Sequence, residues 1–389
     1  MRRDLTIPLS LLVVILAGCV RPDERSIEER ISRVERGLIR EYGDPPWRRM
    51  QLAERMAYHR VPGLSIAFVN RGGIEWTREY GVLEAGRTNA VTAETLFQAA
   101  SIGKMLVAAA ALHHVEQRLL LLDEDVNCRL TSWRVPENEF TAKEKVTLRR
   151  LLSHSAGITV SGFRGYAQGE PVPTLNQVLD GESPANSPPI RVDTVPGTGY
   201  RYSGGGYMVV QQLLMDVCGQ PFPEIMRDTI LKPWGLEVTT FESPLPKNRW
   251  EVAASGHRGD GRPIPGKWHT YPEMGSGASV WSTPSDLARY LIGVMRAYAG
   301  QSDSVLSQPM AARMLTPQVE TRALGPVVGD DGGDRFYFMH PGGNEGFRCV
   351  AVAYPKKGQG VVIMTNSDNG EALWREILNS VSVEYGWVK

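Results

Sequence analysis

The amino-acid sequence predicts an α+β fold in which a single antiparallel sheet is built from both ends of the chain. Runs typical of strands occur at 64–69 and 74–81 and again in the last sixty or so residues, whereas helical patterns fill the region between them. Of the 389 residues, 42% are hydrophobic, which is enough for an extensive core divided between two lobes. We therefore expect a mainly helical lobe inserted into a lobe that holds the sheet and its flanking helices.

The first nineteen residues have the form of a secretion signal. Met1 and two arginines precede an apolar run from Leu5 to Ala17, which is short for a membrane-spanning helix. The run closes with LAGC, which is similar to a bacterial lipobox and implies that Cys19 receives lipid. We expect an exported lipoprotein, anchored in the membrane through Cys19 and facing the periplasm or the cell exterior. An ordinary cleaved signal is the alternative.

Residues 20–61 are expected to form a helical lead-in. Ser26 and Glu29 have the spacing of a capping box, and the apolar residues that follow recur on one helical face. A glycine and two prolines at 43–46 should end this helix, and a second helix is expected at 47–59.

The next segments predict a strand pair and then a buried helix. The runs at 64–69 and 74–81, joined by a glycine turn, predict a β-hairpin. Residues 106–122 are apolar nearly all round, which is typical of a helix in the middle of a protein. Thr147 should cap a short helix that ends near Gly157.

A glycine- and proline-rich region separates this helix from the remaining elements. Residues 157–199 contain seven glycines and six prolines, a density that indicates an ordered loop lining a site. The elements expected after it are helices at 207–217 and 284–298, strands at 335–340, 347–354 and 360–366, and a closing helix at 371–381.

The charge balance argues against a polyanionic partner. Forty-three basic residues match forty-three acidic ones, so no net field would attract nucleic acid. Cys128, Cys218 and Cys349 lack the spacing of a zinc site, although an oxidising compartment would allow one disulfide. The sequence predicts no nucleic-acid partner and no metal, and it leaves the oligomeric state open.

A serine and a lysine stand three positions apart at the start of the buried helix. In FQAASIGKMLV, residues 97–107, Ser101 and Lys104 would project from neighbouring points of one helical face. Serine becomes a strong nucleophile when a neighbour removes its proton, and a lysine can do so when burial lowers its pKa. The pair therefore indicates nucleophilic catalysis, although a serine cap followed by a snorkelling lysine would give the same short pattern.

Two further motifs follow in the chain. PGTGYRYSGGGY at 196–207 places Tyr202 in a glycine-rich turn, and HPGGNEGF at 340–347 follows the first late strand. Together with SIGK at 101–104, they resemble the three motifs of the serine β-lactamase and penicillin-binding-protein family, and in particular its class C-like and esterase branch. The strings TLFQAASIGK, VTLRRLLSHSAGI and STPSDLARYL are also similar to that family.

The resemblance implies the β-lactamase/transpeptidase-like fold and a serine hydrolase that works through an acyl-enzyme without metal or cofactor. Residues 62–389 would form the hydrolase domain, with an α/β lobe at about 62–118 and 272–389 and a helical lobe at about 119–271. The implied roles are a nucleophile at Ser101, a proton partner at Lys104, a proton shuttle at Tyr202, substrate-binding positions at Gly204, His340 and Gly342, and an oxyanion hole made by the N–H groups of Ser101 and Gly343.

Three positions depart from the family pattern. Gly204 stands where the family has an asparagine, His340 replaces a lysine, and Pro341 replaces a threonine. The last two changes weaken recognition of an anion at neutral pH, and Pro341 suits an open sheet edge. We therefore expect an enzyme that hydrolyses esters or amides, with a small ester, D-aminoacyl or peptide-like substrate, rather than an efficient β-lactamase.

Other functions fit parts of the same evidence. A genuine β-lactamase or a penicillin-binding D,D-peptidase would use the same residues, and a lipid-anchored sensor could keep the fold without the chemistry. The sequence AASIG around Ser101 is also close to the nucleophile elbow of α/β-hydrolases, which would require a mainly parallel sheet. Beside the motifs, His154 is expected to support the loop that leads to Gly157, and family spacing selects Tyr202 rather than Tyr200.

Overall fold

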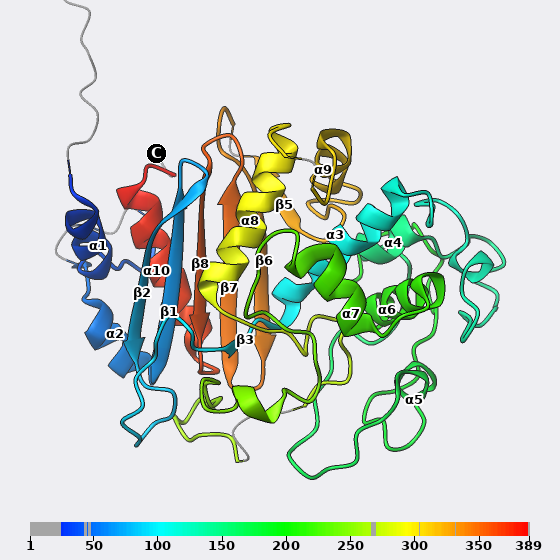
Figure 1. The fold of residues 1–389 in the computed structure, drawn as a ribbon, viewed down its shortest axis with the longest axis horizontal. Helices are drawn as coiled ribbons and strands as arrows, with labels where there is room; N and C mark the ends of the chain where they lie inside the picture. The colour runs from blue at the N-terminus through cyan, green and yellow to red at the C-terminus, as the bar shows by residue number, and fades with distance from the viewer. Residues whose placement is uncertain are drawn as a thin grey trace, which may run out of the picture.

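Six strands form one antiparallel sheet in the order β2-β1-β8-β7-β6-β5 (Figure 1). The computed structural model describes residues 25–42, 45, 48–265, 270–302, 304–330 and 332–387. Near the N-terminus lie β1 (Gly63–Asn70) and β2 (Gly73–Gly81), and the C-terminal part supplies β5 (Val327–Asp330), β6 (Phe336–Asn344), β7 (Phe347–Tyr354) and β8 (Gln359–Thr365).

The two ends of the chain meet where β1 pairs with β8. Leu64 lies opposite Thr365 and Val69 lies opposite Gly360. The predicted α+β class, with a sheet built from both chain ends, is therefore confirmed. Since every strand pair is antiparallel, the parallel sheet of an α/β-hydrolase is excluded among the described residues.

Alternating side chains divide the sheet core into two layers. Ile66 and Phe68 of β1 belong to the layer under α10 (Gly370–Glu384), which also holds α1 (Ile27–Glu35) and α2 (Leu52–His59). Ala67 and Val69 belong to the opposite layer, which is covered by α8 (Pro284–Tyr298). Figure 1 shows α10 and α8 on the two faces of the sheet. The period of two along β1 thus produces two hydrophobic layers.

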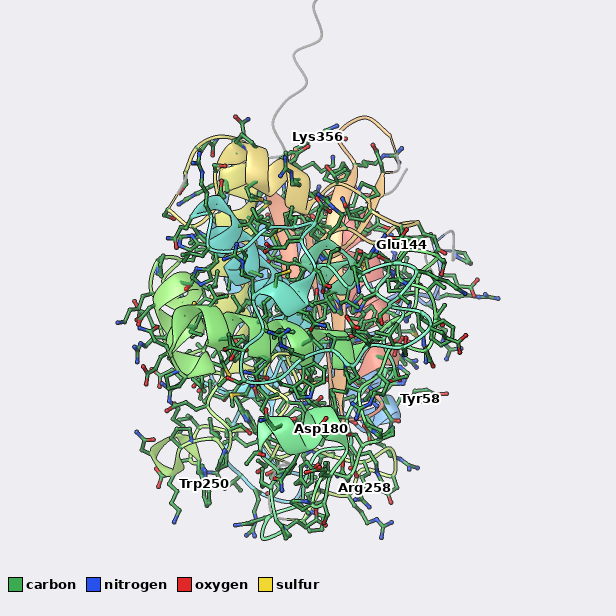
Figure 2. The ribbon with its side chains drawn as sticks, turned by 90° about the vertical axis from the view of Figure 1, so that its right-hand side faces the viewer. Tyr58, Glu144, Asp180, Trp250, Arg258 and Lys356 are labelled. Atoms are coloured by element: carbon green, nitrogen blue, oxygen red, sulfur yellow. The ribbon has the colours of Figure 1, made fainter. Side chains whose placement is uncertain are left out.

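A buried helix lies between the sheet and the other helices. In α3 (Gly103–Glu116), every residue from Gly103 to Leu112 is buried, because alanine and aliphatic side chains surround its axis. It packs against α6 (Gly204–Cys218), α7 (Phe222–Met226) and α9 (Gln308–Met314). The short helices α4 (Leu148–Leu152) and α5 (Leu175–Asp180) lie on the same side, which faces the viewer in Figure 2 with Asp180 labelled.

The predicted caps are confirmed, whereas several boundaries differ. Ser26 and Glu29 form the capping box of α1, and Thr147 caps α4. The helix predicted at 47–59 starts only at Leu52, because Met50 pairs with Leu38 in an isolated bridge. The prediction did not include β5, α5, α7, α9, or the ribbon formed by β3 (Phe97–Gln98) and β4 (Trp281–Ser282).

The membrane anchor is not tested by the structure. No helix in the described part of the chain is long and apolar enough to cross a membrane. Cys19 and the predicted signal at 1–19 lie outside the described residues, and Cys128, Cys218 and Cys349 are free thiols.

Candidate active site

Ser101 stands in a tight turn at the entrance to α3. The turn is the 3₁₀-helix Ala100–Ile102, which follows β3 directly. Ala100 has a φ of 48°, a left-handed conformation that alanine rarely adopts. The surrounding structure must compensate for this local strain, and such strained positions cluster at active sites.

Two side chains, those of Lys104 and Tyr202, lie within hydrogen-bond distance of the Ser101 hydroxyl. The Nζ of Lys104 lies 3.1 Å from Oγ of Ser101, and the OH of Tyr202 lies 2.9 Å from the same oxygen. Lys104 is 2% exposed, and its amine also donates to the carbonyl oxygen of Ser276 at 2.6 Å. No carboxylate of the described residues pairs with this amine. The arrangement places a buried amine and a phenol in contact with one hydroxyl.

Close packing of two glycines brings Ser276 to Lys104. A Cβ added to Gly103 would lie 2.8 Å from the Cα of Gly277, so only glycine allows these backbones to approach. Gly277 also favours glycine because its φ of 78° is a backbone conformation that other side chains rarely adopt. The carbonyl of Ser276 is thereby fixed against the first turn of α3.

The third motif runs along the exposed edge of β6. Pairing with β5 ends at Met339, so the stretch from His340 to Asn344 has a neighbouring strand, β7, on one side only. Gly342 packs against the nucleophile turn so closely that a Cβ there would clash with the carbonyl oxygen of Ala99. Gly342 therefore lies against the turn that carries Ser101, and Gly343 is the next residue along the open part of the strand.

His340 is neutral and buried. Its Nδ1 lies 2.6 Å from the carbonyl oxygen of Pro341, so Nδ1 carries the proton that it donates to this acceptor. Burial lowers the pKa of His340 to about 3, and the charge of Lys104 acts in the same direction. Its Nε2 has no partner among the described residues. This position therefore lacks the positive charge that a lysine would supply.

Gly204 begins α6, and a neighbouring aromatic ring takes up the space next to it. A Cβ at Gly204 would lie 3.1 Å from both the ring of Phe163 and the carbonyl oxygen of Ser161. An asparagine would not fit here without movement of that loop.

Arg322 is a cation near the site that the sequence analysis did not single out. Its guanidinium carbon lies 4.4 Å from the ring centroid of Tyr200, and its buried Nε has no partner among the described residues. Its charge contributes to lowering the pKa of both His340 and His154. No motif surrounds Arg322, so only the fold could reveal it.

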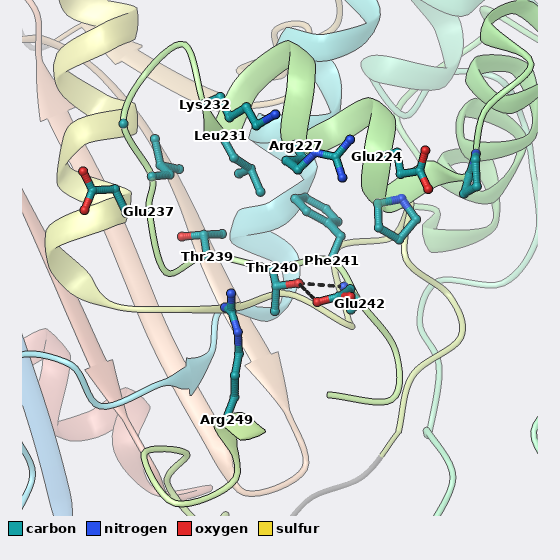
Figure 3. Close-up of a pocket in the computed structure, with 14 residues that line it drawn as sticks. Glu224, Arg227, Leu231, Lys232, Glu237, Thr239, Thr240, Phe241, Glu242 and Arg249 are labelled. Atoms are coloured by element: carbon teal, nitrogen blue, oxygen red, sulfur yellow. Dashed lines mark hydrogen bonds between the residues drawn. The ribbon is translucent and has the colours of Figure 1, made fainter. Parts of the chain in front are cut away.

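Neither of two cavities in the described part of the chain is lined by Ser101, Lys104 or Tyr202. One, of about 610 Å³, is lined by Leu231, Phe241 and Arg249 among others and contains none of the motif residues (Figure 3). The other, of about 790 Å³, lies where β6 ends and is lined by residues that include Tyr166 and Glu345. The second cavity is therefore the one next to the predicted substrate strand.

Comparison with known proteins decides the family. The family described as Beta-lactamase matches residues 49–379, which include all three motifs. The chain belongs to the Beta-lactamase family. The family assignment agrees with the resemblance drawn from the motifs and with a serine hydrolase in the broad sense.

The curated relatives of this Beta-lactamase family member are distant. It is 25% identical over 330 residues to the Unguisins hydrolase ungD' of Aspergillus campestris, covering 79% of this chain and 59% of that protein. It is 29% identical over 261 residues to Penicillin-binding protein 4 of Amycolatopsis lactamdurans, covering 66% of this chain and 65% of that protein. The chain thus spans about three-fifths of the length of these relatives.

Solved structures share the fold of this Beta-lactamase family member. The octameric penicillin-binding protein homologue from Pyrococcus abyssi has a TM-score of 0.71 at 23% identity, covering 86% of this chain and 76% of that one. The D-alanine carboxypeptidase AmpC from Burkholderia cenocepacia has a TM-score of 0.68 at 19% identity, covering 91% of this chain and 100% of that one. The predicted β-lactamase/transpeptidase-like fold is confirmed.

Proposed function

We propose that this protein is a serine hydrolase that forms an acyl-enzyme at Ser101 and cleaves small ester or amide substrates. The observation that carries the proposal is the contact of one hydroxyl with a buried amine and a phenol, at 3.1 Å and 2.9 Å. A half-buried nucleophile with two proton-transferring neighbours is the arrangement that acyl transfer requires.

The proposed reaction proceeds in two steps, acylation of Ser101 and hydrolysis of the acyl-enzyme. Oγ of Ser101 attacks the substrate carbonyl carbon, and its proton passes to the Lys104 and Tyr202 pair. To take this proton the amine must be in its uncharged form at the moment of attack, with one hydrogen on the Ser276 carbonyl and its lone pair toward the hydroxyl. The proton then reaches the departing alcohol or amine, and the bond to that group breaks. Water cleaves the acyl-enzyme by the reverse proton path and restores Ser101.

The substrate preference rests on the charge of the third motif. Because His340 is neutral, it offers no cation for the carboxylate that β-lactams carry. At the third motif this supports esters and amides over β-lactams as substrates, and a substrate carboxylate would need a cation elsewhere. A β-lactamase or D,D-peptidase and a non-catalytic sensor remain the competing proposals.

The position of Arg322 favours one class of amide substrate, in which the peptide ends in a carboxylate. Its guanidinium has no carboxylate partner among the described residues, and it lies near His340 and over Tyr200. A carboxylate at the C-terminal end of a peptide-like substrate could bind there. The D-alanine carboxypeptidase among the structural neighbours makes D-aminoacyl peptides the first amides to test.

A substrate panel tests the proposal. Short-chain p-nitrophenyl esters, D-aminoacyl amides, an acylated D-alanyl-D-alanine peptide and a chromogenic cephalosporin are compared on wild type and Ser101→Ala. We expect ester or amide turnover, an acyl mass adduct on wild type after acid quench, and neither with Ser101→Ala. Rapid cephalosporin turnover without ester cleavage would reverse the substrate preference, and reversible binding without an adduct would favour a sensor.

A charge variant separates the two substrate classes. Arg322→Met should raise KM for the peptide that ends in a carboxylate and leave KM for a neutral ester unchanged. Equal effects on both substrates would remove Arg322 from carboxylate recognition.

A further inference from the structure

We propose that His154 is a positioning residue that fixes the phenol of Tyr202 against Ser101 without itself touching substrate. The proposal rests on the function proposed above, because it assigns a task within that mechanism. His154 lies outside the three motifs, at the C-terminal end of α4.

Three contacts hold the turn that carries Tyr202. The backbone carbonyl of His154 accepts the N–H of Arg201 at 2.8 Å, and its Nδ1 accepts the N–H of Ser203 at 3.1 Å. Its ring lies against the ring of Tyr202, with centroids 4.4 Å apart. His154 therefore hydrogen-bonds the residues on both sides of Tyr202, and its ring packs against the ring of Tyr202.

The hydrogen bond to Ser203 fixes the tautomer of His154. A backbone N–H can only donate, so Nδ1 must present its lone pair and the ring proton must be on Nε2. Burial lowers the pKa of His154 well below its ordinary value. The charges of Lys104 on α3 and Arg322 before β5 act in the same direction, and His340 on β6 would do so only if its ring were protonated. The ring thus stays a neutral acceptor for Ser203.

The backbone of His154 is shaped for this contact. Its φ is 58°, a left-handed conformation in which histidine and asparagine are among the more tolerated side chains. Its ring also lies 5.2 Å from that of Tyr207, whose OH donates to the carbonyl oxygen of Leu152. The contacts thus lead to the Tyr202 turn, rather than to Gly157 as the sequence analysis expected.

Three variants separate the hydrogen bond from general packing. Asparagine places an acceptor oxygen as many bonds from the backbone as Nδ1 and tolerates a positive φ. Glutamine places its oxygen one bond further away, and alanine removes it. We expect His154→Ala and His154→Gln to lower kcat for a p-nitrophenyl ester about 10- to 100-fold, because small misplacements of catalytic groups have effects of this size. His154→Asn should stay within a few-fold of wild type, and KM should hardly change in any of them.

A double-mutant cycle with Tyr202→Phe tests whether His154 acts through Tyr202. If it does, His154→Ala should slow wild type but have little further effect on Tyr202→Phe. An equal loss in both backgrounds would overturn the positioning role and leave the proposed function intact. An unchanged rate for Tyr202→Phe itself would remove Tyr202 from the mechanism and overturn the positioning role, whereas the acyl adduct lost in Ser101→Ala tests the proposed function separately. Melting temperatures identify a variant that fails to fold, in which case the Asn and Gln pair decides.

Discussion

The amine of Lys104 donates to the carbonyl oxygen of Ser276 at 2.6 Å and to the hydroxyl of Ser101 at 3.1 Å. Ser276 belongs to a segment far from Lys104 in sequence, and the Gly103–Gly277 contact presses that segment onto α3. Two elements therefore fix the amine, so its distance from the nucleophile is set by the fold rather than by a flexible side chain.

Removal of the amine should abolish most of the activity while the fold persists. Lys104→Met keeps the length of the side chain but cannot accept a proton, so kcat for a p-nitrophenyl ester should fall about 10²- to 10⁴-fold. The exposed Lys247→Met is the matched control and should behave like wild type. Near-normal turnover by Lys104→Met, with an unchanged melting temperature, would contradict the role of the amine.

Adjacent glycines in β6 should differ sharply in their tolerance of alanine. A Cβ at Gly342 would clash with the Ala99 carbonyl, whereas a Cβ at Gly343 would make an ordinary 3.4 Å contact with Arg348. Gly342→Ala should reduce the free energy of unfolding by about 1–3 kcal/mol, and Gly343→Ala by much less. Urea denaturation of both variants measures these changes. Equal decreases in the free energy of unfolding would show that the turn carrying Ser101 does not pack closely against Gly342.

Glu273 should make the protein less stable as the pH rises. Its side chain is fully buried, neither oxygen has a partner among the described residues, and burial raises its pKa to about 8 from 4.5. Between those values the folded chain keeps a proton that the unfolded chain has lost. The free energy of unfolding therefore decreases as the pH rises from about 4.5 to about 8. Above about pH 8 the carboxyl is ionised in both states, so this group causes no further decrease.

A neutral substitution at Glu273 tests this sign. Glu273→Gln should be more stable than wild type at about pH 9, by at most about 5 kcal/mol, and the difference should shrink towards about pH 5. The exposed Glu251→Gln serves as the control. Urea unfolding that shows the same difference at both pH values would mean that Glu273 is ionised in the folded protein.

We propose that Cys19 carries the lipid that holds the exported protein at the membrane. Full-length wild type expressed in a bacterial host should then fractionate with membranes and label with a palmitate analogue. Cys19→Ala should do neither, because it lacks the thiol that would carry the acyl chains whose burial holds the protein at the membrane. A Cys128→Ala variant controls for loss of another thiol, and a Cys19→Ala protein found wholly in the membrane fraction would refute the anchor.

Local patterns predicted the residues that meet at Ser101, because the motifs are short and the buried helix is apolar on every side. The burial of Lys104 follows from that helix. Arg322 could not be predicted, since it stands in an irregular segment and reaches the site only through the fold. The contact of His154 with Ser203 joins residues 49 positions apart, so the local sequence suggested a nearer partner.

The fold class was predictable because strand-like runs cluster at both chain ends. The boundaries of individual helices and strands were harder to predict. Periodicity alone extended the second helix back to 47, and it could not register the pairing of Leu38 with Met50 that keeps this part extended. The four-residue β5 is too short to show an alternating pattern, and pairing with β6 stabilises it instead.

The pairing of β1 with β8 has a consequence for biosynthesis. One side of β1 has no neighbour until residues 359–365 have left the ribosome, so the sheet closes over nearly the whole length of the polypeptide. Closure across so long a loop is entropically costly and slow. A premature stop codon upstream of Gln359 would leave an apolar strand with bare amides and carbonyls, ready to aggregate with other nascent chains.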